Sequence, residues 1–336
     1  MKYHQVAWLA VCLALGVVVL GAFVRLSDAG LGCPDWPGCY GHMDWPVHET
    51  EIQQANARFP DRPVEPHKAW REMVHRYFAG TLGLLVLALF VWAWRRRNTD
   101  ISGQDSPVGL ASFLLLVIIA QAALGMWTVT LKLKPVIVML HLLGGLTTLA
   151  LLLWLALRTT PGLQPYRYAG HIRPWMVGLG LALLVGQIAL GGWTSANYAA
   201  LACPDFPTCQ GSWWPKMDFS EAFILWRGIG PNYEFGVLDM PARTAIHLMH
   251  RIGFLLLSLY LIWLATRLMK NRELLPWGLG LLGLLILQIG LGISNVLFSL
   301  PLPVATLHNM GAALLLLFMV ALLYKTRSSR RNGGSG

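Results

Sequence analysis

Eight long apolar runs constrain the fold of this sequence more than any other feature. Hydrophobic residues make up 55% of the chain and charged residues only 12%, a balance that ordinary soluble domains do not have. A helix that crosses a bilayer needs about 20 mainly apolar residues, and each run reaches that length with a few polar flanking residues. The sequence therefore predicts an all-α integral membrane protein with eight transmembrane helices. The runs cover residues 7–23, 78–94, 108–131, 135–157, 174–201, 252–266, 274–301 and 303–324.

The formal net charge of +10 is explained by the positions of the basic residues between the runs. They gather at alternate connections and near the C-terminus, in 95–97, 158–173, 267–272 and 325–331. Because cytoplasmic loops of membrane proteins are enriched in Lys and Arg, these segments and both termini are predicted to be cytoplasmic. The loops 25–71 and 196–243 then lie outside a bacterial cytoplasmic (inner) membrane. No nucleic-acid partner is expected, because the charge reports topology.

Several motifs recur in the same order at nearly one spacing. The box Cys33-Pro-Asp-Trp-Pro-Gly-Cys39 returns 170 positions later as Cys203-Pro-Asp-Phe-Pro-Thr-Cys209. Chance similarity of apolar segments does not explain a repeated cysteine box, so the sequence predicts two duplicated four-helix bundles. An even number of helices per copy makes the copies parallel, related by a pseudo-two-fold axis along the membrane normal. The other recurring elements are His75 and His250, Gln121 to Gly125 and Gln288 to Gly292, and His141 and His308.

The predicted repeat divides the chain into two bundles of similar length. The first covers residues 1–160 and the second covers 161–331, whereas 332–336 is interpreted as the remnant of an expression linker. Glycines inside the helices, such as Gly125 and Gly191, suit close helix packing, which we place ahead of a seat for a flat cofactor.

The paired cysteines lie in the outside loops, where the compartment is oxidising. Two Cys six residues apart in a Pro-rich loop suit a local disulfide, so we expect one bond between Cys33 and Cys39 and one between Cys203 and Cys209. A metal site is an alternative, although neither pair has His residues at zinc-like spacing. A redox-active disulfide is the other alternative.

Four histidines lie near the start of the even-numbered predicted spans, and therefore at one depth near the outer face. A single His in a membrane helix is often a packing residue, but four at one level indicate a site. Two imidazoles that face each other across a four-helix bundle are a common way to ligate haem iron. Carboxylates do not recur at all four helices, as a di-iron site would require. We therefore expect both bundles to bind haem, through His75, His141, His250 and His308.

The two copies differ one helical turn before a candidate iron ligand. Glu72 precedes His75 on the same helix face, whereas His247 occupies the corresponding position before His250. An ionisable group at this depth is costly, which favours a catalytic role for Glu72 over simple pairing with an arginine such as Arg71. Arginines near the outer ends are candidates for contacts with haem propionates, although they also suit membrane anchoring. They are Arg25, Arg76, Arg243 and Arg251.

Together these features resemble the haem A synthase family over essentially the whole chain. The resemblance rests on the duplicated unit, the cysteine box, Glu72-Met-Val-His-Arg76 and the single His of each later even-numbered span. It implies an enzyme that oxidises the C8 methyl of haem O to a formyl group with water-derived oxygen, making haem A for terminal cytochrome oxidase. It also implies paired cysteines in the outer loops.

The resemblance further assigns the two bundles different roles. It implies a haem b cofactor between His250 and His308, and the substrate haem O between His75 and His141, with Glu72 as the catalytic carboxylate. Haem O synthase is a candidate partner, and the electron acceptor is not identified by the sequence.

Two other classes of protein share some of these features. The main alternative is a non-enzymatic di-haem membrane cytochrome that transfers electrons from quinol. Electron transfer across the membrane would be better served by a His pair at each face, and these spans carry theirs at one end. A transporter would have broken helices with polar groups at the midplane.

Overall fold

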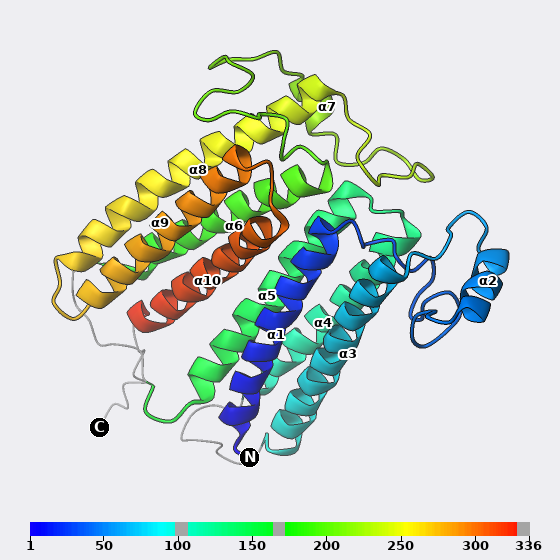
Figure 1. The fold of residues 1–336 in the computed structure, drawn as a ribbon. Helices are drawn as coiled ribbons and strands as arrows, with labels where there is room; N and C mark the ends of the chain where they lie inside the picture. The colour runs from blue at the N-terminus through cyan, green and yellow to red at the C-terminus, as the bar shows by residue number, and fades with distance from the viewer. Residues whose placement is uncertain (98–106, 164–171, 328–336) are drawn as a thin grey trace.

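The computed structural model describes residues 1–97, 107–163 and 172–327, and the fold within these ranges is helical. Eight helices are long and apolar enough to span a membrane, which confirms the number predicted from the sequence. Two short helices, α2 (Glu49–Arg58) and α7 (Phe219–Ala222), lie in the long connections. The long helices are α1 (Tyr3–Leu26), α3 (Pro66–Arg95), α4 (Val108–Thr130), α5 (Pro135–Thr159), α6 (Pro174–Ala196), α8 (Met240–Met269), α9 (Leu275–Leu297) and α10 (Leu302–Thr326), all visible in Figure 1.

Helices α3 and α8 begin well before the apolar runs that predicted them. Helix α3 begins at Pro66 and α8 at Met240, each with a proline in its first turn, where the missing N–H costs no helical hydrogen bond. The apolar runs end at charged residues, so they do not include the polar first turns of these two helices. As a result, Glu72 and His247 lie inside continuous helices rather than in loops.

The long helices pack in two groups of four. Helices α1, α3, α4 and α5 contact one another in the first group, and α6, α8, α9 and α10 form the second. The groups meet where α1 and α5 pack against α6 and α10, and one buried apolar cluster extends through both (Figure 1). The loops with α2 and α7 lie at the opposite end of the molecule from the N-terminus and the end of α10.

The two cysteine loops have the same local structure. The disulfides Cys33–Cys39 and Cys203–Cys209 are both formed, with S–S distances of 2.00 Å, which confirms the predicted pairing. In each loop, a carboxylate two residues after the first Cys accepts hydrogen bonds from two successive backbone N–H groups. These are Asp35 with Tyr40 and Gly41 (2.6 and 2.7 Å), and Asp205 with Gln210 and Gly211 (2.5 and 3.0 Å).

The second loop has one additional contact that stabilises its carboxylate. The Thr208 hydroxyl donates to Asp205. This bond, together with those from the backbone N–H groups, holds the pKa of the Asp205 carboxyl below its ordinary value. The loop therefore keeps an ionised carboxylate at its centre at neutral pH. The proposed linker remnant, 332–336, lies outside the described residues.

Candidate functional site

Each of the four predicted histidines lies against a glycine of a neighbouring helix. A Cβ added at Gly21 would come within 2.9 Å of Cε1 of His75, and one at Gly191 within 3.1 Å of Cε1 of His250. Gly125 and Gly292 lie against His141 and His308 in the same way, at 3.2 Å each. Such distances are shorter than ordinary carbon–carbon contacts, so a larger residue would displace the imidazole. These glycines therefore make room for histidine rings, whereas the sequence favoured general helix packing.

The histidines come together in two pairs. His75 on α3 and His141 on α5 are close enough to interact electrostatically within the first group of helices. His250 on α8 and His308 on α10 do so within the second group. All four lie in the part of their helix nearest the cysteine loops. The structure thus brings together two imidazoles from two different helices in each group.

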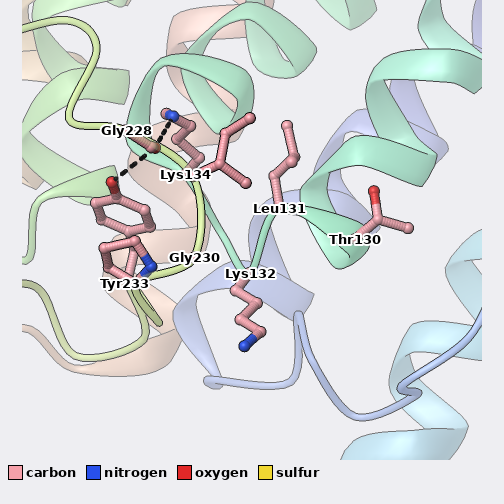
Figure 2. A pocket seen from close by; sticks show the side chains of 9 residues that line it. Thr130, Leu131, Lys132, Lys134, Gly228, Gly230 and Tyr233 are labelled. Carbon is pink, nitrogen blue, oxygen red and sulfur yellow. Dashed lines mark hydrogen bonds between the residues drawn. The ribbon is translucent and has the colours of Figure 1, made fainter.

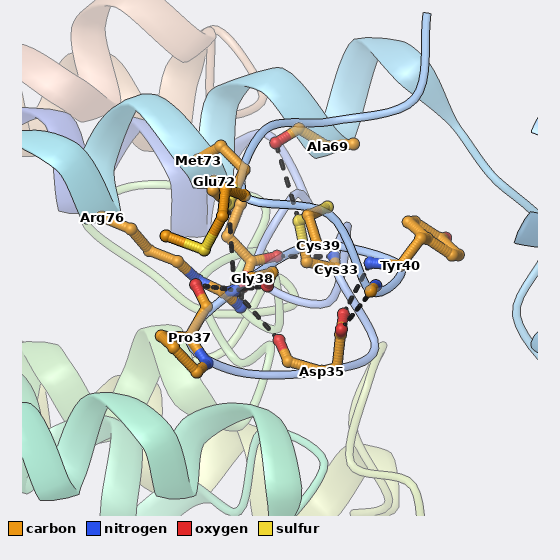
Figure 3. The surroundings of a disulfide bond; sticks show 12 residues. Cys33, Asp35, Pro37, Gly38, Cys39, Tyr40, Ala69, Glu72, Met73 and Arg76 are labelled. Atoms are coloured by element: carbon orange, nitrogen blue, oxygen red, sulfur yellow. Dashed lines mark hydrogen bonds and ion pairs between the residues drawn. A yellow bond between two sulfur atoms is a disulfide. The ribbon is translucent and has the colours of Figure 1, made fainter. Parts of the chain in front are cut away.

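Glu72 is buried at the junction of α3 and the first cysteine loop, as Figure 3 shows. The residue is 5% exposed, and its Oε2 accepts a hydrogen bond from the Cys33 N–H at 2.9 Å. Its Oε1 forms an ion pair with Arg76. The alternative partner considered from the sequence, Arg71, instead lies over the aromatic rings of Phe23 and Trp70.

Arg76 attaches the first loop to α3. Its guanidinium group donates to the carbonyl oxygens of Asp35, at 3.0 Å, and of Gly38. Hydrogen bonds from a charged donor are stronger than neutral ones, so this residue holds the loop over the helix. The loop and the Glu72 carboxylate form one connected network.

The second half has the corresponding network, with a histidine in the place of Glu72. Arg251 donates to the carbonyl oxygens of Asp205 and Thr208 at 2.8 and 2.7 Å. Nδ1 of His247 lies 3.3 Å from the Cys203 N–H, where Glu72 lies in the first half. A neutral imidazole is therefore sufficient to hold this loop, and the negative charge of Glu72 is an addition specific to the first half.

The arginines predicted to contact haem propionates donate to main-chain carbonyl oxygens in this structure. Arg25 reaches from α1 to the carbonyl oxygen of Ser195 (2.5 Å) and lies over the ring of Tyr198 (4.1 Å), which links the two groups of helices. Arg243 donates to the carbonyl oxygen of Leu238 at 2.7 Å. Nε of Arg25 and Nε of Arg251 are buried without a partner, so both keep a free donor.

A small pocket lies between the α4–α5 turn and the loop after α7 (Figure 2). Lys134 and the hydroxyl of Tyr233 both donate to the carbonyl oxygen of Gly228 there. Its cavity volume is about 60 Å³, whereas sites for molecules of cofactor size occupy about 300–1,000 Å³. This pocket cannot hold a haem, and the histidine pairs remain the candidate site.

Three glutamines beside the histidines were not recognised as site residues in the sequence. Each Nε2 donates to the main-chain carbonyl oxygen of a histidine on the neighbouring helix. One sequence feature could have identified them. Each is an amide side chain inside an apolar helix, four residues before a glycine that lies against a histidine ring. The residues are Gln121, Gln187 and Gln288.

Comparison with known proteins places this arrangement in a family. The family model described as COX15-CtaA, cytochrome oxidase assembly protein, matches residues 4–320. The chain belongs to the haem A synthase (COX15-CtaA) family. The resemblance noted in the sequence is thereby confirmed.

Several relatives of this family align over almost their full length. The heme A synthase of Shewanella oneidensis is 49% identical over 325 residues, covering 95% of this chain and 96% of the relative. The heme A synthase of Maricaulis maris is 28% identical over 342 residues, covering 95% of each chain. That of Paracoccus denitrificans is 28% identical over 337 residues, covering 92% of this chain and 84% of the relative.

Proposed function

We propose that this chain is a membrane oxidoreductase that converts haem O to haem A by oxidising the C8 methyl group to a formyl group. The observation that carries this function is the 49% identity to a haem A synthase over 95% of the chain. Membership of the cytochrome oxidase assembly family supports terminal cytochrome oxidase as the destination of the product. The finer assignments below rest on the geometry of the histidine pairs.

The two groups of helices are copies of one four-helix unit, related by a pseudo-two-fold axis along the membrane normal. Positive φ angles that recur at nearly one spacing support the duplication. Left-handed φ angles occur at Tyr40 and again at Gln210, and at Leu133 and again at Leu300. Such angles are uncommon for residues other than glycine, so their recurrence is hard to explain by chance. Residues 1–160 and 161–331 then form the two units.

The second unit holds a haem b cofactor between His250 and His308. The residues present fit such a group, because two imidazoles from different helices lie together and each is seated on a glycine. Nδ1 of His308 is buried without a hydrogen-bond partner, so this ring nitrogen is free to bond to another group. A bound haem would supply one-electron redox chemistry. Arg251 has a free donor for a propionate.

The first unit binds the substrate haem O between His75 and His141. Its glycine seats match those of the second unit, which supports the same mode of ligation. Arg25 lies near the end of α1 and Arg76 follows His75 on α3, and Arg25 has a free donor for a propionate. Both sites lie near the outer face, with both termini in the cytoplasm, as the basic cytoplasmic segments support.

Glu72 is the catalytic carboxylate of the first unit. Oxidation of a methyl to a formyl group takes up one water and releases four protons and four electrons. The residue lies one helical turn from His75 on the same helix face, so its carboxylate would be the group of this chain that accepts a proton released in the oxidation. Because His247 holds the matching loop without a negative charge, the carboxylate is not needed for loop attachment. The electrons pass to an acceptor outside this chain.

The test is to extract and separate haems from cells that supply haem O and produce either the wild type or His75→Ala. We expect haem A from the wild type, and no haem A but unchanged bound haem b from His75→Ala. A wild type that contains haem b and forms no modified haem would favour the di-haem electron-transfer cytochrome. Haem A formation by His75→Ala at the wild-type rate would show that the substrate does not bind through His75.

A further inference from the structure

Three of the four candidate ligands are held by a glutamine from the neighbouring helix. In each case the Nε2 donates to the main-chain carbonyl oxygen of the histidine and also lies near one ring nitrogen. The amide therefore contacts the backbone and the imidazole of the same residue. The distances to the carbonyl oxygen and the ring nitrogen are 2.8 and 3.4 Å for Gln121 and His141, 2.9 and 3.0 Å for Gln187 and His250, and 3.0 and 3.4 Å for Gln288 and His308.

A second glycine, three residues after each of these histidines, leaves room for the amide. A Cβ added at Gly144 would lie 2.2 Å from Oε1 of Gln121, and one at Gly253 or Gly311 would lie 2.5 or 2.3 Å from the corresponding oxygen. No side chain fits at these distances unless the glutamine moves. We call the glutamine and this glycine together the brace of a histidine.

His75 has no brace. Its ring lies against Gly21 of α1, so the glycine seat is present, and it hydrogen-bonds to the main chain at Val17 in place of a glutamine amide. Val17 stands four residues before the seat, where the other helices carry glutamine, and Phe78 stands three residues after His75, where they carry glycine. The histidine therefore keeps the position of a ligand without the amide that would hold it there.

In their braces, the two units differ at one ligand, His75 against His250. Val17 lies 170 positions before Gln187, and Phe78 lies 175 positions before Gly253, the same offsets that relate the cysteine boxes and His75 to His250. Glu72 and His247, which also differ between the two units, are likewise 175 positions apart. By contrast, His141 and His308 have corresponding glutamines and glycines, namely Gln121 and Gln288, Gly125 and Gly292, and Gly144 and Gly311.

Hydrogen bonds to a metal-ligating histidine fix its orientation, and their loss commonly lowers metal affinity by about 10–100-fold. A resident cofactor has to be kept, whereas a substrate has to enter and its product has to leave in every turnover. We propose that a brace fixes a histidine in place as a haem ligand, and that His75, the one histidine of the substrate pair without a brace, is the ligand that opens for exchange of substrate and product. This inference rests on the haem assignments proposed above.

Grafting a brace onto His75 tests the inference directly. The double variant Val17→Gln/Phe78→Gly supplies the amide and the space for it, and the matched control Val17→Leu/Phe78→Gly supplies the space alone. The measurement is the rate at which purified protein loaded with haem O gives up that haem to an excess of apomyoglobin, followed by absorbance. We expect the graft to slow release from the first unit by about 10-fold or more relative to the control, with haem b retained in both.

The reverse change tests the brace in the second unit without depending on the graft. Gln187→Leu is expected to speed the loss of haem b to apomyoglobin by about 10-fold or more. Equal release of haem O from the graft and its control would overturn the inference, and so would wild-type retention of haem b by Gln187→Leu.

A pair of single variants separates failure of the brace from failure of the proposed function. His75→Ala and His141→Ala should each weaken haem O binding if the substrate lies between them. If both do so while the brace variants change nothing, only the role of the brace is wrong. If both bind haem O as the wild type does, the site assignment fails and the brace inference fails with it.

Discussion

Replacing Glu72 with glutamine is expected to slow the conversion of haem O to haem A by about 100-fold or more, the usual contribution of a positioned proton acceptor. Glutamine has nearly the same shape and can still accept the hydrogen bond from the Cys33 N–H. It cannot accept a proton at neutral pH, and it does not balance the charge of Arg76. The measurement is haem A formed per molecule of protein, by extraction and chromatography, with haem b content as the internal standard.

His247→Gln is the matched control for this variant, because residue 247 contacts the second cysteine loop as Glu72 contacts the first. We expect it to leave the rate of haem A formation within a few-fold of the wild type. If Glu72→Gln also converted haem O at the wild-type rate, Glu72 would only hold the loop and would have no part in the chemistry.

Removing either histidine of the second unit is expected to have the other large effect. In the proposed site each histidine would provide one of two bonds to haem b, so its loss should lower affinity by more than the roughly 10–100-fold typical of a supporting hydrogen bond. Purified His250→Ala and His308→Ala should therefore contain little haem b and form little haem A. The measurement is the haem content per protein together with the absorption spectrum of the reduced form.

The corresponding change in the first unit is the control for these variants. His141→Ala should lose haem A formation while keeping haem b, because His141 belongs to the other pair. An unchanged haem b content and spectrum in both His250→Ala and His308→Ala would contradict the assignment of the cofactor. If only His141→Ala lost haem b, the cofactor would belong to the first unit and the substrate to the second.

The sequence predicted the features that depend on composition and local spacing. The eight spans follow from apolar length, and the pairing of Cys33 with Cys39 follows from a short Pro-rich loop in an oxidising compartment. Family membership was also predicted correctly, from motifs that recur across the chain. The roles assigned to the histidines and to Glu72 stay predictions that the variants above test.

The partners of individual side chains were not predicted in the same way. The partner of Glu72 is Arg76 and not Arg71, because residues four apart on a helix lie on one face whereas adjacent residues do not. The hydrogen bond from Cys33 to Glu72 joins residues 39 positions apart and depends on how the loop folds back. The contact of Arg25 with Ser195 depends on how the two groups of helices pack.

The glutamines show how a visible pattern can be left without a role. Gln121 and Gln288 were noticed as part of the repeat, but a repeat alone does not say what an amide contacts. Only the structure places each amide against the histidine of the next helix. Once that contact is known, Val17 becomes informative. Of the four helices whose glycine lies against a histidine ring, only the one with Val17 lacks the glutamine.

The most direct test of the account is an experimental structure of the purified protein with haem O bound. We expect haem O between His75 and His141, with the edge that carries the C8 methyl turned toward Glu72, and haem b between His250 and His308. Haem O bound elsewhere, or bound there with its C8 methyl on the side away from Glu72, would contradict it.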